Sequence, residues 1–180
     1  VLDWSGNVFI YDIELQLLFS QFYANDNVGV FGITYDGEYL WIGNDFGNIY
    51  GYDLSGNLIG SFSTPFSDWN AITWDGEYFI ICEAWTENPV FYRLDYTGSI
   101  IDSYTSSIPN SNAYQIIWVP GHQGAELWVS DMFNLYQLSF EEGNANLVTQ
   151  IPFPDFYDVA IGHDGTDLWS NPVDGNELHQ

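Results

Sequence analysis

Basic residues are nearly absent from this sequence. Arg93 is the single Lys or Arg in 180 residues, against 25 Asp and Glu, so the formal net charge is −24. Binding to a phosphate backbone depends on clustered Lys and Arg that displace counterions. The composition therefore argues against nucleic acid as a partner. It favours cationic surfaces or neutral ligands, with solubility as the simplest reason for the charge.

Cysteine and long apolar runs are also scarce. Cys82 is the only cysteine, so no intramolecular disulfide can form, and its place in an apolar run predicts a buried, inert thiol. No run approaches the roughly 20 apolar residues of a membrane helix, so we expect no membrane insertion. The chain begins at Val1 without Met and shows no signal peptide, and we therefore expect a processed or excised segment.

Sequence motifs of common enzymes are missing as well. There is no GxSxG elbow, P-loop or dinucleotide fingerprint. His122, His163 and His179 are scattered, without the spacing of a zinc site. A catalytic site would have to be built from residues that converge only in space.

What the sequence does contain is internal repetition. The segment ITYDGEYLWI, which starts at Ile33, returns as ITWDGEYFII from Ile72. Short apolar or aromatic runs between residues 33 and 62 alternate with turns at Asp36-Gly37, 46–48 and 55–57. Asp-Gly is a strong hairpin signal because both residues tolerate the positive φ of a type I′ turn. This stretch predicts four antiparallel strands, since its glycine density would break a helix.

The unit recurs along the chain. A second copy spans residues 72–104, a degenerate third spans 115–148, a truncated fourth starts at Val159, and residues 6–12 match residues 47–53. A unit of roughly 40 residues with four antiparallel strands is typical of a β-propeller blade. The sequence resembles the propeller superfamily, and most closely the degenerate xGIxxDGxYLW repeats of secreted bacterial and archaeal proteins related to NHL and quinoprotein-like propellers. The resemblance covers nearly the whole chain and implies an architecture, not an activity, because propellers host unrelated functions.

We predict an all-β fold class with one domain over residues 1–180, a small propeller of about four blades. The expected blades are 29–66, 67–109, 110–153, and 154–180 combined with 1–28. The last two pieces overlap, because residues 175–180 and 6–12 both match the third strand of a blade.

Three arrangements of the chain ends remain open. One copy of that strand lies outside a closed four-bladed ring, or the ends complement a neighbouring subunit in a ring or filament, or the chain is a fragment of a larger propeller. In each arrangement the terminal strands are the sites of assembly. The assembly residues that we select on them are Val8, Ile10, Leu168, Trp169 and Leu178.

Most tryptophans have a structural interpretation. Trp41, Trp128 and Trp169 share one strand position after the first turn of the repeat, where Ile80 stands in the second copy, so we expect them to pack between blades. Trp69 and Trp85 fall outside the repeat consensus. They are the candidates for an exposed ligand contact, for example with a glycan.

The repeated aspartates also have a structural interpretation. Asp36, Asp75 and Asp164 each precede Gly, and an Asp carboxylate can accept hydrogen bonds from the backbone amides that follow it in a turn.

No cofactor follows with certainty from the sequence, and calcium is the candidate. The resemblance to propellers includes hydrolases of the lactonase kind, whose active sites are rings of oxygen and His ligands at the mouth of the central channel. Ca²⁺ takes carboxylate and amide oxygens as ligands. Segments that enter the first strand of each blade carry the candidate metal ligands Asp26, Asp68, Asp155 and Asp158. Solvated loops are the alternative, because these acids do not share one repeat position.

These observations predict a non-enzymatic structural or binding propeller module that assembles with itself into a homo-oligomer or homopolymer. The expected location is extracellular or at the cell surface, which rests on the resemblance, the lack of Lys and the missing Met. A metal-dependent, lactonase-like hydrolase is the first alternative. A glycan-binding module that uses Trp69 or Trp85 is the second.

Overall fold

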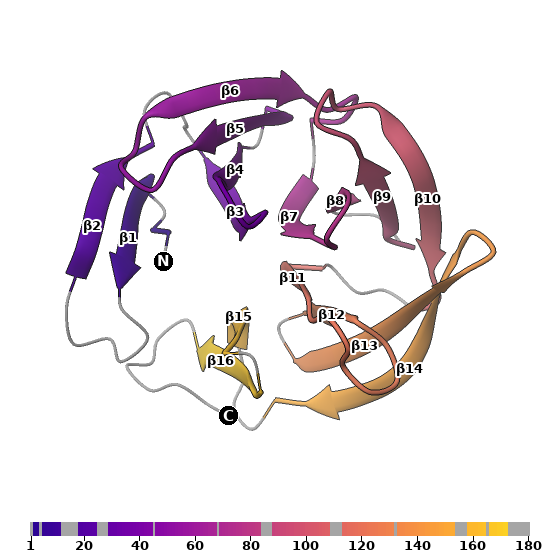
Figure 1. Ribbon diagram of the computed structural model, residues 1–180. Helices are drawn as coiled ribbons and strands as arrows, with labels where there is room; N and C mark the ends of the chain where they lie inside the picture. Colours follow the sequence, from indigo (N-terminus) through magenta and orange to yellow (C-terminus); the bar gives the residue numbers. More distant parts are fainter. Residues whose placement is uncertain are drawn as a thin grey trace.

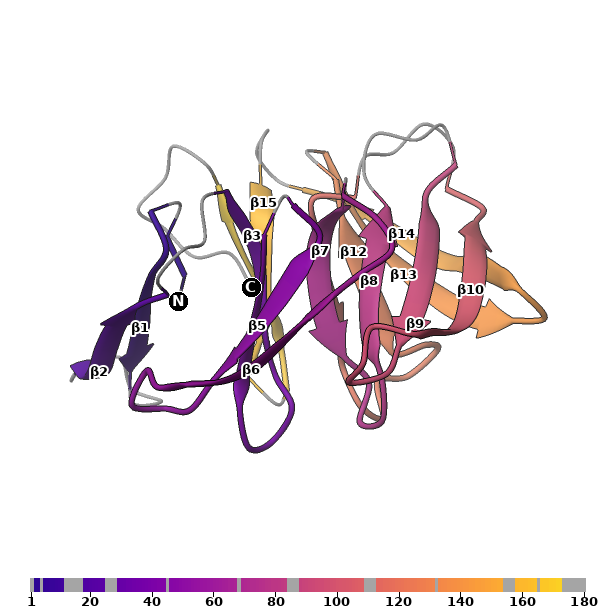
Figure 2. The ribbon, with the colours of Figure 1, turned by 90° about the horizontal axis from the view of Figure 1, so that it is seen from above.

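The computed structural model describes residues 2–3, 5–11, 18–24, 29–44, 46–67, 69–83, 88–108, 113–131, 133–153, 158–164 and 166–172. All regular structure in these segments is β-strand, as the sequence predicts. The strands are arranged around a common centre (Figure 1), and most of them run along the central axis in the side view (Figure 2). No helix among the described residues is long and apolar enough to cross a membrane.

Three four-stranded antiparallel units follow one another around the centre, each with its first strand innermost (Figure 1). Unit I consists of β3 (Val30–Tyr35), β4 (Leu40–Asn44), β5 (Asn48–Tyr52) and β6 (Leu58–Ser63). Unit II consists of β7 (Trp69–Trp74), β8 (Phe79–Glu83), β9 (Val90–Leu94) and β10 (Ile100–Ser106). Unit III consists of β11 (Gln115–Trp118), β12 (Leu127–Ser130), β13 (Asn134–Glu141) and β14 (Asn144–Pro152).

Each end of the chain forms a hairpin of its own. The N-terminal hairpin pairs β1 (Asn7–Tyr11) with β2 (Leu18–Tyr23), and the C-terminal hairpin pairs β15 (Asp158–His163) with β16 (Leu168–Pro172). Within the described residues these hairpins are separate two-stranded sheets. They flank the units at the two ends of the series (Figure 1).

The strand register identifies which part of a unit each hairpin represents. Asn7 pairs with Tyr23 as Asn48 pairs with Ser63, and both ladders have a register shift immediately before their last pair. The C-terminal hairpin instead copies β3–β4, because His163 pairs with Leu168 as Tyr35 pairs with Leu40. The N-terminal hairpin therefore corresponds to the two outer strands of a unit, and the C-terminal hairpin corresponds to the two inner strands.

Apolar side chains fill the space between successive elements. Val8 packs with Ile42 between the N-terminal hairpin and unit I, and Trp41 packs with Phe79 between units I and II. Further clusters join unit II to unit III, and unit III to the C-terminal hairpin. Trp41 and Trp128 are each only 5% exposed, so the prediction that they pack between repeats is confirmed. Burial of this apolar surface is the main stabilising contribution to the fold.

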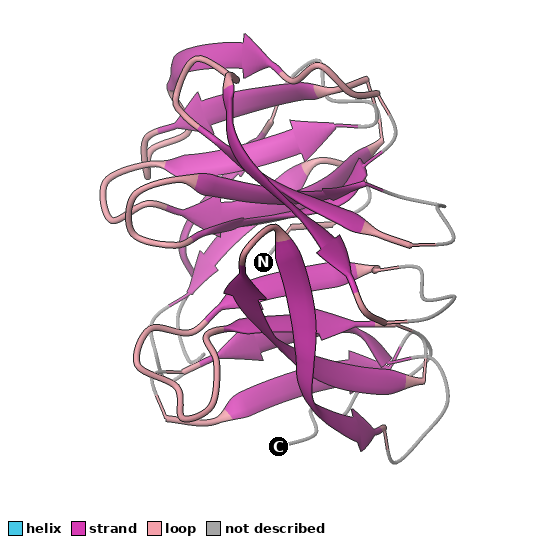
Figure 3. Cartoon of the chain, turned by 90° about the vertical axis from the view of Figure 1, so that its right-hand side faces the viewer, coloured by secondary structure: helices cyan, strands magenta, loops and turns pink. Residues whose placement is uncertain are grey.

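Units II and III share an additional contact that the repeat does not predict. The outer strand β10 pairs in parallel with β14 through Thr105–Asn144 and Ser106–Ala145. The two units therefore form one continuous eight-stranded sheet, on the side of the molecule that Figure 3 presents. This pairing protects part of two outer edges that would otherwise be open to other chains.

Candidate functional site

Several predicted site residues lie outside what the structure describes. Trp69 and Asp158 begin β7 and β15, but only their backbone is described. The remaining residues outside the description are Asp26, Asp68, Asp155, Trp85 and Leu178. The calcium and glycan hypotheses therefore stay predictions.

Three of the other predicted assembly residues contact the neighbouring unit with their side chains, and the fourth makes a contact within its own hairpin. Val8 is buried, and Ile10 packs against the same cluster beside unit I. Leu168 packs against the cluster that contains Trp128, and the Trp169 indole donates a hydrogen bond to Asp164 in its own hairpin. Their role in assembly stays a prediction.

The aspartates of the first turn form one recurring arrangement. Asp36 Oδ1 accepts the backbone N–H groups of Glu38 and Tyr39, at 2.8 and 2.7 Å. Asp75 Oδ1 makes the same two bonds with Glu77 and Tyr78. Gly37 supports the turn because its φ of 103° lies in the left-handed region, which disfavours other residues. The turn-forming interpretation of these aspartates is therefore confirmed.

The second carboxylate oxygen, Oδ2, of each turn aspartate lies against a side chain, which is Trp in two turns and Arg in the third. Trp41 Nε1 donates to Asp36 Oδ2 at 2.7 Å, and Trp169 Nε1 donates to Asp164 Oδ2 at 2.8 Å. In unit II, Arg93 Nε lies 2.8 Å from Asp75 Oδ2 in an ion pair without hydrogen-bond alignment. Hydrogen bonds from the Asp167 amide and the Trp169 indole lower the pKa of Asp164 to about 2.

Arg93 sits among aromatic rings as well as beside Asp75. Its guanidinium carbon lies between 5.7 and 6.0 Å from the ring centres of Tyr78, Tyr104, Trp118 and Phe140. Cation–π attraction of this kind strengthens when the cation is partly removed from water. The only Lys or Arg of the sequence is thus held at the boundary between units II and III.

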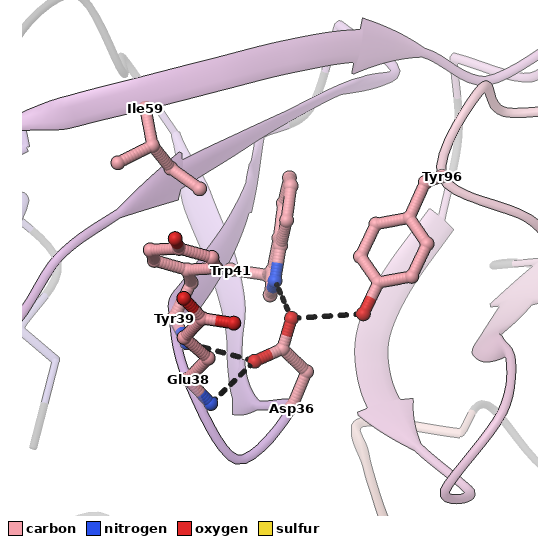
Figure 4. A pocket seen from close by; sticks show the side chains of 6 residues that line it. All are labelled: Asp36, Glu38, Tyr39, Trp41, Ile59 and Tyr96. Atoms are coloured by element: carbon pink, nitrogen blue, oxygen red, sulfur yellow. Dashed lines mark hydrogen bonds between the residues drawn. The ribbon is translucent and has the colours of Figure 1, made fainter.

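A hollow of about 380 Å³ opens where unit I meets unit II. Figure 4 shows its lining, which consists of Asp36, Glu38, Tyr39, Trp41, Ile59 and Tyr96. The Tyr96 hydroxyl comes from the third turn of unit II and donates to Asp36 Oδ2 at 3.0 Å. We call this hollow the Glu38 pocket.

The Glu38 pocket is electronegative. Burial, the hydrogen bond to Asp36 and the charges of Asp36 and Glu38 raise the pKa of Tyr96 to about 12. Glu38 also raises the pKa of Tyr39, through a hydrogen bond and its charge. Burial alone would raise the pKa of Asp36, but its four hydrogen bonds outweigh burial and lower it. Asp36 is therefore ionised and fully bonded, while Glu38 is the exposed carboxylate of the pocket.

A second hollow of about 470 Å³ lies beside Arg93, between Tyr104, Trp118 and the turn at residues 121–126. His122 Nδ1 accepts a hydrogen bond from Trp128 Nε1 at 2.7 Å, so this histidine takes the place of the turn aspartate in unit III. Glu126 accepts the Gly121 amide. These side chains are committed to the turn.

Cys82 matches its prediction. The side chain is fully buried, and burial together with the charge of Glu83 raises the pKa of its thiol. The thiolate that reacts with electrophiles or metals is therefore disfavoured.

No known protein family and no curated protein matches this sequence. Solved structures do match its shape. A WD40 β-propeller domain of Doa1 aligns with a TM-score of 0.63 and 16% identity, over 95% of this chain and 56% of that one. The chain has a β-propeller fold. A chain of the mitotic checkpoint complex aligns with a TM-score of 0.54 and 17% identity, over 95% of this chain and 69% of that one.

A protein of unknown function from Bacteroides caccae is also similar, with a TM-score of 0.60 and 7% identity, over 99% of this chain and 70% of that chain. At identities this low, the likeness concerns the fold and carries no activity with it.

Proposed function

We propose that this propeller is a non-enzymatic structural module that assembles head to tail through its terminal hairpins. The observation that carries the proposal is their complementarity. The C-terminal hairpin supplies the two inner strands of a blade and the N-terminal hairpin supplies the two outer strands, yet the two form separate sheets among the described residues. A strand edge without a partner is a template for a strand from another chain.

The internal repeat supplies the register of the joint. In unit I, Leu40 pairs with Tyr52 and Trp41 pairs with Gly51 between the second and third strands. The same ladder places Leu168 of one copy opposite Tyr11 of the next, and Trp169 opposite Ile10. The completed blade would be the fourth of the ring.

The order of the inner strands supports a joint between copies. In sequence order, β3 contacts β7, β7 contacts β11, and β11 contacts β15. No comparably extensive contact joins β15 back to β3 within the described residues. A head-to-tail contact joins two different surfaces of the same chain, and it builds rings or filaments, depending on the rotation between copies. We place this assembly outside the cell, in line with the resemblance to secreted propellers.

Disulfide trapping tests the joint directly. Cysteines are introduced at Leu168 and Tyr11, which the proposed register places opposite each other. After mild oxidation, we expect a ladder of disulfide-linked multimers on a non-reducing gel. The matched control combines Leu168→Cys with Tyr23→Cys, because Tyr23 is more than half exposed and lies at the end of the outer strand β2. Cys82 is fully buried and stays in both variants.

Light scattering and negative-stain microscopy of the unmodified protein complete the test. Rings or filaments are expected together with the multimer ladder. A cross-linked species of one chain mass would show that the blade closes within a single copy and would overturn assembly between copies. The absence of any cross-link in the variant with Leu168→Cys and Tyr11→Cys would overturn strand complementation itself.

A further inference from the structure

The same four residues, Asp-Gly-Glu-Tyr, form the first turn of both unit I and unit II, at 36–39 and 75–78. In unit II this turn already holds a guanidinium group. Arg93 Nε lies 2.8 Å from Asp75 Oδ2, and its guanidinium carbon lies 6.0 Å from the centre of the Tyr78 ring. The molecule itself thus shows that a turn of this sequence can accommodate an arginine side chain.

The turn of unit I has no arginine partner from this chain, because Arg93 is the only arginine of the sequence. Gly51 stands at the position of Arg93, because Gly51 pairs with Trp41 as Arg93 pairs with Ile80. The Trp41 indole supplies the donor that Asp36 requires. In front of this indole the Glu38 pocket opens to solvent, with Glu38 exposed at its rim.

We propose that the Glu38 pocket binds the guanidinium group of an arginine side chain that a different protein presents. Glu38 offers a carboxylate that can pair with a guanidinium in a bidentate manner. The rings of Tyr39 and Tyr96 provide aromatic surface for the planar cation, and Ile59 provides apolar surface for its aliphatic stem. The field of a chain with a net charge of −24 steers cations toward the protein.

The partner is not a second copy of this chain. Arg93 is the only Lys or Arg of the sequence, and its side chain is 23% exposed and paired with Asp75. A metal ion fits the pocket less well, because Asp36 already accepts four hydrogen bonds and much of the remaining wall is aromatic or apolar. Calcium takes six to eight oxygen ligands, which this wall does not offer.

Ligand-observed saturation-transfer NMR provides the test, because it suits weak binding and large assemblies. The probe is N-acetylarginine amide, and the matched ligand is N-acetylcitrulline amide, which has the same shape without the charge. We expect saturable binding of the arginine probe only. Glu38→Gln should weaken it by about fivefold or more, since an exposed but bidentate pair and its cation–π contacts are lost or loosened together.

The control variant comes from the repeat itself. Glu77→Gln changes the same position of the same turn in unit II, where Arg93 is already present, and should alter binding less than about twofold. Equal weakening by Glu38→Gln and Glu77→Gln would reduce the binding to general surface charge and overturn the proposal. Equal binding of the citrulline probe, or no saturable binding to the unmodified protein, would overturn it as well.

Discussion

Units I and II stabilise the same turn in two different ways. In unit I the donor to the turn aspartate is the Trp41 indole on the second strand, and the residue opposite it is Gly51. In unit II the second strand carries Ile80, and the cation beside the aspartate comes from Arg93 on the third strand. The aspartate stays the same because the backbone of the turn requires it, whereas its donor can come from either strand.

The cross-strand pairs Trp41–Gly51 and Ile80–Arg93 also differ in which strand carries the larger side chain. A Cβ atom at Gly51 would lie 2.7 Å from Trp41 Cζ3, so in unit I the indole occupies the space that a side chain at residue 51 would need. Ile80 leaves the corresponding space to Arg93. The two residues of the pair therefore differ together between the repeats, and in each repeat one large side chain contacts the turn aspartate. The predictions below test this equivalence.

Removal of the unit II cation should have the largest effect. Arg93→Met leaves Asp75 Oδ2 without a partner, and the Asp75 side chain is only 3% exposed. We expect a loss of about 3 kcal/mol in the free energy of unfolding, because an uncompensated buried charge remains. Urea denaturation measures this loss. Asp75→Asn in the same chain should recover part of it, and a loss below about 1 kcal/mol for the single variant would show that the pair is not a structural equivalent of Asp36–Trp41.

A side chain at the Gly51 position should have the next largest effect. Gly51→Ala should lower the free energy of unfolding by about 2 kcal/mol, because the Trp41 ring must move out of a packed site. The matched control is Gly60→Ala on the neighbouring strand, where an added Cβ meets nothing within 4 Å. Adding Trp41→Ile to Gly51→Ala should give less than the sum of the two losses in a double-mutant cycle. Additive losses would contradict the coupled exchange.

Acid should weaken the unit I turn. The pKa of Asp36 lies below its ordinary value of 3.8 in the folded protein. Its contribution to stability is therefore complete above that pH and is lost as the pH falls through the lower, folded value. Asp36→Asn should cost about 1 to 2 kcal/mol near neutral pH, because the hydrogen bonds from Trp41 and Tyr96 lose an ionised acceptor. Urea denaturation at several pH values should show this difference shrinking below about pH 4, and a constant difference would contradict it.

Loss of the hydrogen bond between Tyr96 of unit II and Asp36 of unit I should have the smallest effect on stability. Tyr96→Phe keeps the ring that packs near Trp41 and Phe79 but removes the hydroxyl donor to Asp36. A loss of about 0.5 to 1 kcal/mol is expected in thermal unfolding. Tyr35→Phe is the control, because the Tyr35 hydroxyl donates to the Gly37 carbonyl within the same exposed turn. If both variants lose the same amount, the bond between units adds nothing beyond a surface turn.

The sequence alone could predict the features that depend on nearby residues. The Asp36 turn is made by amides two and three residues further on, so its role was readable from Asp-Gly and the residues beside it. The burial of Cys82 followed from an apolar run. Tyr96, by contrast, bonds to a residue 60 positions away, and no local pattern marks that contact. The Glu38 pocket was missed for this reason, although the repeated turn with a single Arg93 was a signal for it.

Sequence by itself determined the strands, the turns between them and the order in which the repeats follow, because hairpin pairing and Asp-based turns involve neighbours in the chain. Tertiary structure decided which donor serves each turn aspartate. It also decided that β10 pairs with β14 and that the two end hairpins form separate sheets. These outcomes depend on how whole units pack against one another. That packing balances buried apolar area, side-chain volume and unpaired strand edges over residues that are far apart in the chain.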